Sequence, residues 1–165
     1  MREKPILFST PMVQAILDDR KSMTRRVIKP QPSENVNRVI MERGLEGTVR
    51  AKFMANTYCL SRYDSPQYQP GDILWVRETW QNLAEDSDDG EMYNNWLYKA
   101  DKENTPFGHD DEGNPFYLKW RPSIHMPKVA ARIWLEVVSV RVERLQEITY
   151  DDCLREGMWN YGTDV

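Results

Sequence analysis

The sequence is poor in residues that hold metals or form disulfides, with two cysteines and two histidines in 165 residues. Cys59 and Cys153 lie far apart and neither has a CxxC partner, so the sequence indicates neither a disulfide framework nor a zinc knuckle. His109 and His125 do not form the HxxxH or HxH pairs that hold a metal. We therefore expect reduced thiols, no metal and no cofactor.

Long apolar runs are also missing. No uncharged apolar segment approaches the roughly 20 residues that span a bilayer, and residues 1–12 lack the apolar core of a secretion signal. Apolar residues still make up 40% of the chain, and six tryptophans and eight tyrosines can close a core. We expect a single domain over residues 1–165, a cytoplasmic location and no membrane partner.

The net charge of −4 conceals an uneven distribution along the chain. Residues 1–80 carry 13 Lys and Arg against 9 Asp and Glu, whereas residues 84–116 carry 2 against 10. The acidic balance therefore describes one segment and not the whole surface, so it does not exclude a nucleic-acid partner.

The N-terminal pattern predicts a strand, a helix and a second strand. Residues 5–9, PILFS, are typical of a short strand, and Thr10 is expected to cap a helix that ends near residues 19–20. Residues 24–30, TRRVIKP, then predict a strand that the final proline stops.

The middle of the chain predicts one deeply buried strand between long connections. Residues 31–69 show weak periodicity and several prolines and glycines, which favours loops with one strand near residues 51–60. Residues 70–80, PGDILWVRETW, predict a turn followed by a strand that is apolar on both faces. By alternation Glu78 continues one apolar face of this strand, and Arg77 lies on the other face.

The C-terminal half completes an α+β pattern. The acidic segment 84–116 predicts a solvated loop that contains one strand, NWLYKA. Residues 131–146 are the strongest strand pattern, and their apolar parity changes near residues 137–138, as in a β-bulge. Thr149 and Asp152 predict a capping box for a short helix. Many short strands with few helices predict an α+β fold on a small, bent, partly closed β-barrel with long loops.

Lys21 and Thr24 stand three residues apart at the expected junction of helix and strand, so both can face one small site. A threonine hydroxyl needs a base before it acts as a nucleophile, and lysine serves as that base when burial or neighbouring cations lower its pKa. Arg20, Arg25 and Arg26 supply such cations.

Glu78 is the carboxylate best placed to complete such a site. Its apolar strand face would raise its pKa, so that it could donate a proton to a leaving amine. The alternative is that Glu78 pairs with a buried arginine. Spacing alone does not choose between these roles, because geometry makes a site.

The cations of residues 19–30 also suit contacts with phosphate groups, whereas the alternative is a solvated strand edge. Aromatic and polar side chains elsewhere could complete a nucleotide-binding surface. The candidate binding residues are Arg20, Arg25, Arg26, Trp75, Arg77, Trp80 and His125. Tryptophans more often pack in a core, and a lone histidine in a proline-rich loop more often belongs to a turn.

Three stretches of the sequence together resemble a known family. They are STPMVQAIL…RKSMTRRVIKPQP, PGDILWVRETW and WRPSIHMPKVAARIWLEV…VRVERLQEIT. They closely resemble phage- and prophage-encoded proteins with an ASCH domain, a branch of the PUA-like β-barrels, over residues 5–30, 70–80 and 117–157. For the wider superfamily the resemblance rests on the pattern GxKxxTxR followed by a strand glutamate. Asp19 stands at the glycine of that pattern.

The resemblance implies a PUA-like barrel whose cleft suits RNA or a modified nucleoside, with loop insertions at about 31–69 and 84–116. One ASCH branch comprises N4-acetylcytidine amidohydrolases, which use lysine as base, threonine as nucleophile and glutamate as acid. Lys21, Thr24 and Glu78 match those positions, and Arg26 matches the motif arginine. A phage-encoded protein would act in the host cytoplasm.

Two functions therefore stay open from the sequence. One is an amidohydrolase that acts on an acylated cytidine, and the other is a non-catalytic module that binds RNA or DNA. Salt-sensitive binding of oligonucleotides is expected of the second. The sequence carries no signal for the oligomeric state.

Overall fold

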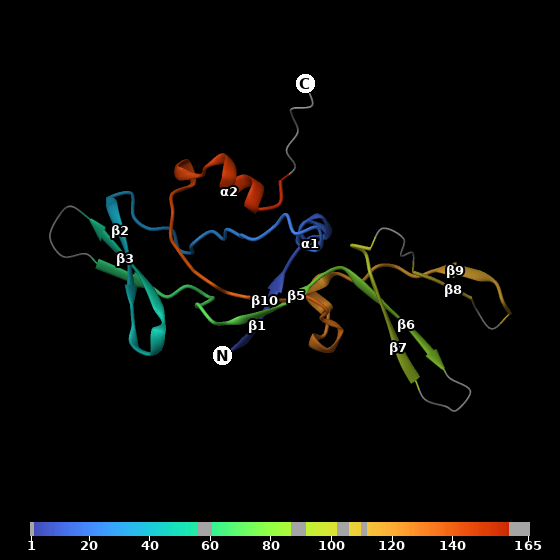
Figure 1. The fold of residues 1–165 in the computed structure, drawn as a ribbon. Coiled ribbons are helices and arrows are strands. Elements are labelled where there is room, and N and C mark those ends of the chain that lie inside the picture. Colours follow the sequence, from blue (N-terminus) through green and yellow to red (C-terminus); the bar gives the residue numbers. More distant parts are fainter. Residues whose placement is uncertain (1, 56–60, 87–91, 102–105, 110–111, 159–165) are drawn as a thin grey trace, which may run out of the picture.

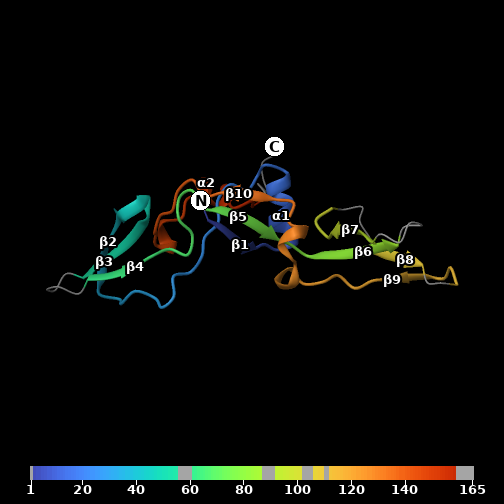
Figure 2. The ribbon, with the colours of Figure 1, turned by 90° about the horizontal axis from the view of Figure 1, so that it is seen from below.

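The computed structural model describes residues 2–55, 61–86, 92–101, 106–109 and 112–158. In these residues the chain is mostly β with few helices, in an α+β arrangement. The strands form four separate sheets, and none of the sheets in the described residues closes into a barrel. Figures 1 and 2 show an elongated molecule, in which a central sheet has other sheets toward both ends.

The central sheet contains three strands in the order β1 (Glu3–Leu7), β5 (Ile73–Arg77) and β10 (Trp134–Glu136). β1 runs parallel to β5, whereas β10 runs antiparallel to it. β5 follows the expected turn, where Gly71 has a φ of 81° that favours glycine. The sequence prediction of a deep strand at this position is confirmed.

Helix α1 (Thr10–Leu17) packs on the central sheet through Val13, which is fully buried. The helix begins one residue before the predicted start, because Ser9 and not Thr10 is the N-cap residue. One apolar cluster joins this helix to the sheet, and its buried members are Ile6, Phe8, Val13, Leu74, Val76 and Ala100.

A second sheet contains β2 (Val36–Arg43), β3 (Val49–Ala55) and β4 (Ser61–Asp64), all antiparallel. Residues 31–69 are therefore not mainly loop, and the prediction of a single strand there was wrong. The expected strand at 51–60 overlaps β3, but residues 56–60 lie outside the described residues. Charged residues along β2 interrupt its apolar alternation, since this sheet is partly exposed.

The acidic segment also contains more strands than predicted. β6 (Trp80–Asp86) pairs with β7 (Met92–Tyr98), which includes most of the expected NWLYKA strand. β8 (Phe107–His109) pairs with β9 (Pro115–Tyr117). Both are two-stranded ribbons, which are marginally stable on their own and depend on packing against the rest of the protein.

Short helices complete the fold. Helix α2 (Tyr150–Arg155) begins with the predicted capping box, in which Asp152 N–H donates to the Thr149 hydroxyl at 3.2 Å. Four single 3-10 turns lie at Leu45–Gly47, Ser123–His125, Lys128–Ala130 and Leu145–Glu147. In the described part of the chain no helix has the length and apolar character needed to cross a membrane.

One predicted strand is not formed, and another is shorter than predicted. Residues 24–30 have no strand partner, because the preceding amides of Ser22 and Met23 bond to the carbonyl oxygen of Arg155 in α2. β10 ends at Glu136, since β5 begins at Ile73 and leaves residues 138–144 no strand to pair with. The predicted parity change is present in the burial pattern, where residues 138 and 139 are both exposed.

Candidate functional site

The Lys21 side chain is buried directly after α1, and its amine is held by two main-chain carbonyl groups. Nζ donates to the carbonyl oxygen of Met23 at 2.7 Å and to that of Glu156 at 2.9 Å. It also lies 5.7 Å from the ring centroid of Phe8. The amine is therefore fixed from three sides, by its own segment, by the end of α2 and by the end of β1.

This environment changes the basicity of the amine. Burial lowers the pKa of Lys21, the Glu156 carboxylate partly opposes that effect, and Arg26 lowers the pKa further. The pKa of Lys21 thus lies below its ordinary value. Burial has the largest effect on the pKa of Lys21, and the neighbouring cation Arg26 has a smaller one.

The backbone turn before Lys21 retains the shape that a glycine favours. Asp19, which stands at the glycine of the ASCH pattern, has a φ of 55°, in the left-handed region. Asp and Asn adopt this region more readily than most other residues, although at some cost in free energy. Asp19 therefore adopts a conformation that glycine also favours, two residues before Lys21.

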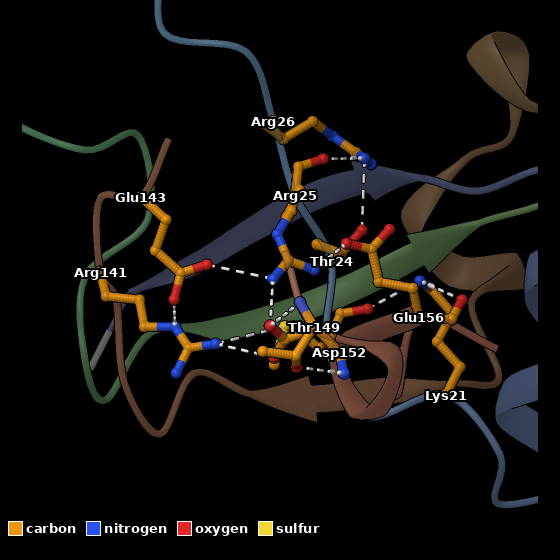
Figure 3. Close-up of polar contacts among 10 residues, drawn as sticks. Lys21, Thr24, Arg25, Arg26, Arg141, Glu143, Thr149, Asp152 and Glu156 are labelled. Atoms are coloured by element: carbon orange, nitrogen blue, oxygen red, sulfur yellow. Dashed lines mark hydrogen bonds and ion pairs between the residues drawn. The ribbon is translucent and has the colours of Figure 1, made fainter. Parts of the chain in front are cut away.

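Thr24 is half-buried on the same segment, and Arg26 approaches its hydroxyl. Arg26 Nη1 donates to Thr24 Oγ1 at 3.3 Å, as Figure 3 shows. Its Nη2 donates to the carbonyl oxygen of Leu7 at 3.2 Å. The guanidinium also lies 5.8 Å from the Phe8 ring centroid. The predicted grouping of Thr24 with Arg26 is thus present, although the segment is not a strand.

Phe8 connects this group to Glu78 on the neighbouring strand. The register of β1 and β5 pairs Leu7 with Arg77, and the Phe8 amide donates to the Arg77 carbonyl oxygen at 3.1 Å. Phe8 and Glu78 come directly after this pair, so we expect them to lie opposite each other and to continue the buried face of the two strands. Phe8 is 4% exposed and Glu78 is 1% exposed.

Glu78 is paired with an arginine. Arg132 Nε donates to Oε1 at 2.9 Å and Nη2 donates to Oε2 at 3.0 Å, so both carboxylate oxygens are occupied. Burial raises the pKa of Glu78 and the bonds to Arg132 oppose that effect, with the pKa remaining above its ordinary value. The alternative considered for Glu78, pairing with an arginine, is therefore realised together with a raised pKa.

Arg132 is the most important residue that the sequence reasoning missed. Its Nη1 bonds to Asp101, and its guanidinium lies 4.0 Å from the ring centroid of Tyr98, whose hydroxyl donates to the Ala130 carbonyl oxygen. A buried carboxylate requires a cation as partner, so the buried position of Glu78 in the sequence pattern is the signal that predicts one. Spacing could not identify which arginine this is, because Arg132 follows 54 residues later.

The three proposed catalytic side chains all lie within the described residues, and no hydrogen bond or ion pair joins any two of them there. Lys21 and Thr24 belong to one short segment, and Glu78 follows β5 beside the end of β1, where Phe8 lies. The Lys21 amine and the guanidinium of Arg26, which donates to Thr24, both approach the Phe8 ring.

The other predicted cations have different positions. Arg20 bonds to Asp18 at 2.8 Å and to the Gly157 carbonyl oxygen at 3.0 Å. Arg25 points away from Arg26 and forms ion pairs with three carboxylates, which Figure 3 shows on both sides of its guanidinium. Arg26 is the one among these three that lies over Phe8.

The predicted aromatic and histidine contacts are spread over a second region. Trp80 is 4% exposed and packs in a core cluster, so its ring faces are covered by protein. Arg77 lies 5.4 Å from the ring centroid of half-buried Trp75 and donates to the Ile124 carbonyl oxygen. His125 is exposed at the end of the adjacent 3-10 turn.

The described residues contain no group of three or more His, Cys, Asp or Glu side chains placed to hold a metal ion. Cys153 is half-buried and forms no disulfide, while Cys59 lies outside the described residues. Comparisons with models of protein families, with curated proteins and with solved structures give no match to this chain.

Proposed function

We propose that this chain is a nucleic-acid- or nucleoside-directed protein of the ASCH type, and that it hydrolyses the acyl amide of a modified cytidine. The proposal includes a PUA-like barrel, to which the β1–β5–β10 sheet would belong. The observation that carries it is a buried amine beside Phe8 and a buried carboxyl group at the adjacent end of β5, each with a pKa moved toward neutrality. Such pairs are characteristic of acid–base sites.

Lys21 is the general base. A neutral amine has two N–H donors and one lone pair, and the two carbonyl groups of Met23 and Glu156 accept both donors. The lone pair is then left to accept the proton of Thr24. The lowered pKa supports this role, because it increases the fraction of neutral amine at physiological pH.

Thr24 is the nucleophile. Because Arg26 donates to its oxygen, the hydroxyl proton is free to pass to Lys21, and the positive guanidinium favours the developing alkoxide. The oxygen attacks the acyl carbon and forms a new C–O bond, after which the C–N bond to the cytosine amine breaks. Water then hydrolyses the acyl-threonine, releasing a carboxylic acid and restoring the hydroxyl.

Glu78 is the general acid that protonates the departing amine. Protonation makes one oxygen of Glu78 an O–H donor toward the substrate, while the other oxygen still accepts from Arg132. The raised pKa supports this role, because it keeps the proton on Glu78 closer to neutral pH.

The test is turnover of N4-acetylcytidine, offered both as the free nucleoside and within an RNA oligomer, with cytidine release followed by chromatography. Lys21→Met, Thr24→Val and Glu78→Gln are each expected to lower the rate by about 10²–10⁴-fold. Lys119→Met, at an exposed lysine outside the β2–β3–β4 sheet, and Thr48→Val, beside that sheet, are matched controls that should retain activity. Absence of turnover by the unchanged protein, or full activity of Lys21→Met, rejects the reaction.

A non-catalytic RNA- or DNA-binding module is the second candidate, and the outer face of the β2–β3–β4 sheet favours it. The strand register places Arg38, Arg50, Lys52 and Tyr63 on this face, with Glu42 as its one carboxylate. Tyr63 is 51% exposed, so its ring can stack on a base while the cations bind phosphates.

This second candidate predicts binding of labelled single-stranded RNA or DNA that weakens as salt increases. Replacing Arg38 or Arg50 with methionine should lower the magnitude of the salt slope by about 0.7 for each lost phosphate contact. Lys119→Met, at an exposed lysine outside this sheet, serves as the control. Failure of both nucleic acids to bind at low salt would exclude the module.

A further inference from the structure

The segment that carries Lys21 is docked on the C-terminal end of α2. The amides of Ser22 and Met23 donate to the Arg155 carbonyl oxygen at 2.9 and 3.0 Å, and Arg20 Nη1 donates to the Gly157 carbonyl oxygen at 3.0 Å. The last carbonyl groups of a helix have no partner within the helix. Here the loop supplies donors to them, so each segment satisfies the other.

Lys21 itself lies against the residues that follow α2. Its amine donates to the Glu156 carbonyl oxygen, and the two residues form an isolated β-bridge. Gly157 has a φ of 91°, and a Cβ atom there would lie 3.2 Å from Lys21 Cβ and 2.6 Å from Ala15 Cβ. The lysine stem therefore runs past a glycine that has no room for a side chain.

Ion pairs of Arg25 stabilise this contact between the Lys21 segment and the end of α2. Arg25 Nη1 lies 2.5 Å from Glu156 Oε1, and its Nη2 lies 3.0 Å from both Asp152 and Glu143, as Figure 3 shows. Arg141 bonds to Asp152 at 3.0 Å and also to Glu143. Arg25 is thus surrounded by carboxylates, which disfavours its use as a phosphate ligand.

We propose that helix α2 and residues 156 and 157 together position the Lys21 amine, and we call these residues the seat. Arg25 is a positioning residue, which holds the seat in place through its ion pairs and does not contact the ligand. The effect of this positioning on catalysis rests on the proposed function. The positioning of the Lys21 amine by the seat does not depend on it. The amine is faced by Glu156 from α2, by Arg26 from its own segment and by the uncharged ring of Phe8 from β1.

The seat is tested by titrating the Lys21 amine in protein labelled with ¹³C and ¹⁵N lysine, with Lys21→Met identifying the signal. The unchanged protein should show a Lys21 pKa below that of its exposed lysines. Glu156→Gln removes the attractive charge and keeps the carbonyl acceptor, so the pKa should fall further. Glu147→Gln, at an exposed carboxylate of the 3-10 turn before α2, is the control. An ordinary pKa, or equal effects of both changes, would overturn the seat.

The role of Arg25 is tested by hydrogen exchange of the Ser22 and Met23 amides. Arg25→Met should increase both exchange rates about tenfold, because the docked segment opens more often, and Arg25→Lys should restore part of the protection. Lys128→Met, which removes an exposed ion pair with Glu3 on another part of the chain, is the control. Unchanged exchange in Arg25→Met contradicts this role of Arg25.

A third measurement separates this inference from the proposed function. If N4-acetylcytidine is turned over, Arg25→Met should lower kcat with KM unchanged, whereas an arginine that binds the substrate would raise KM. If the nucleoside is not turned over but the Lys21 pKa responds to Glu156→Gln as stated, the hydrolase fails and the seat stands. Loss of RNA binding in Arg25→Met, with unchanged amide exchange, would assign Arg25 to the ligand and overturn the inference.

Discussion

Arg132 is expected to be the residue whose loss most strongly destabilises the site, because among the described residues it is the cation that pairs with Glu78. Glu78 is 1% exposed and both of its oxygens bond to Arg132. Breaking a buried ion pair costs about 3–5 kcal/mol, since the remaining charge stays without a partner. The Arg132 side chain keeps 27% exposure, so we expect Arg132→Met to cost about 3 kcal/mol at pH 7.5.

The predicted loss depends on the charge of Glu78, which gives it a pH dependence. The pKa of Glu78 is already above its ordinary value of 4.5, and removal of Arg132 raises it further. The folded Arg132→Met variant then disfavours the charged form of Glu78. The full loss of stability is therefore expected above the pKa that Glu78 has in this folded variant. It becomes smaller as the pH falls through that pKa toward 4.5, because the carboxyl group is protonated.

Urea unfolding, followed by tryptophan fluorescence at pH 7.5 and pH 4, measures these free energies. The double variant Glu78→Gln with Arg132→Met should lose less than Arg132→Met alone at pH 7.5, by at least about 1 kcal/mol. Arg155→Met, at an exposed ion pair with Asp151, should cost less than about 1 kcal/mol. Equal losses from Arg132→Met with and without Glu78→Gln would refute the reasoning.

Three further changes test the backbone and charges around Lys21. Asp19→Gly should raise the free energy of unfolding by about 0.5–1 kcal/mol, since glycine adopts a φ of 55° without strain, and a lower urea midpoint would contradict this. Gly157→Ala should lower it by about 1–3 kcal/mol because the new methyl group meets Ala15, and unchanged stability would show that the contact relaxes. The pKa of Asp152 is lowered to about 2, chiefly by its bonds with Thr149, so the stability it contributes is complete above about pH 4 and is lost as the pH falls toward 2. Asp152→Asn should therefore be less stable than the unchanged protein at pH 6, and acid titrations of the two proteins should converge near pH 2.

The best sequence predictions concern features that a few neighbouring residues determine. The capping box of α2 depends on residues three apart, Thr149 and Asp152, and it is present as expected. The alternation in β5 placed Glu78 on a buried face, because a strand sends every second side chain to the same side. Lys21 and Thr24 lie on one short segment for a similar reason, since three residues of chain cannot separate them widely.

The errors arose where a segment needed a distant partner. The apolar alternation of residues 138–142 is real, but β5 has no residues left to pair with it beyond the turn at Gly71. Residues 24–30 alternate as a strand would, but α2 takes the amides of Ser22 and Met23 at the start of the segment. Strand propensity is expressed only where a neighbouring edge is available.

The sequence by itself determined the local elements, the buried face of Glu78 and the nearness of Lys21 to Thr24. Only the tertiary structure decided that Arg132 pairs with Glu78 across 54 residues and that Arg25 pairs with Glu156 across 131. Charges pair with whichever opposite charge the packed chain brings within reach, and that choice depends on how the sheets and helices are arranged. The side chains that set the chemistry of this site were therefore identifiable by type, but their partners only by the fold.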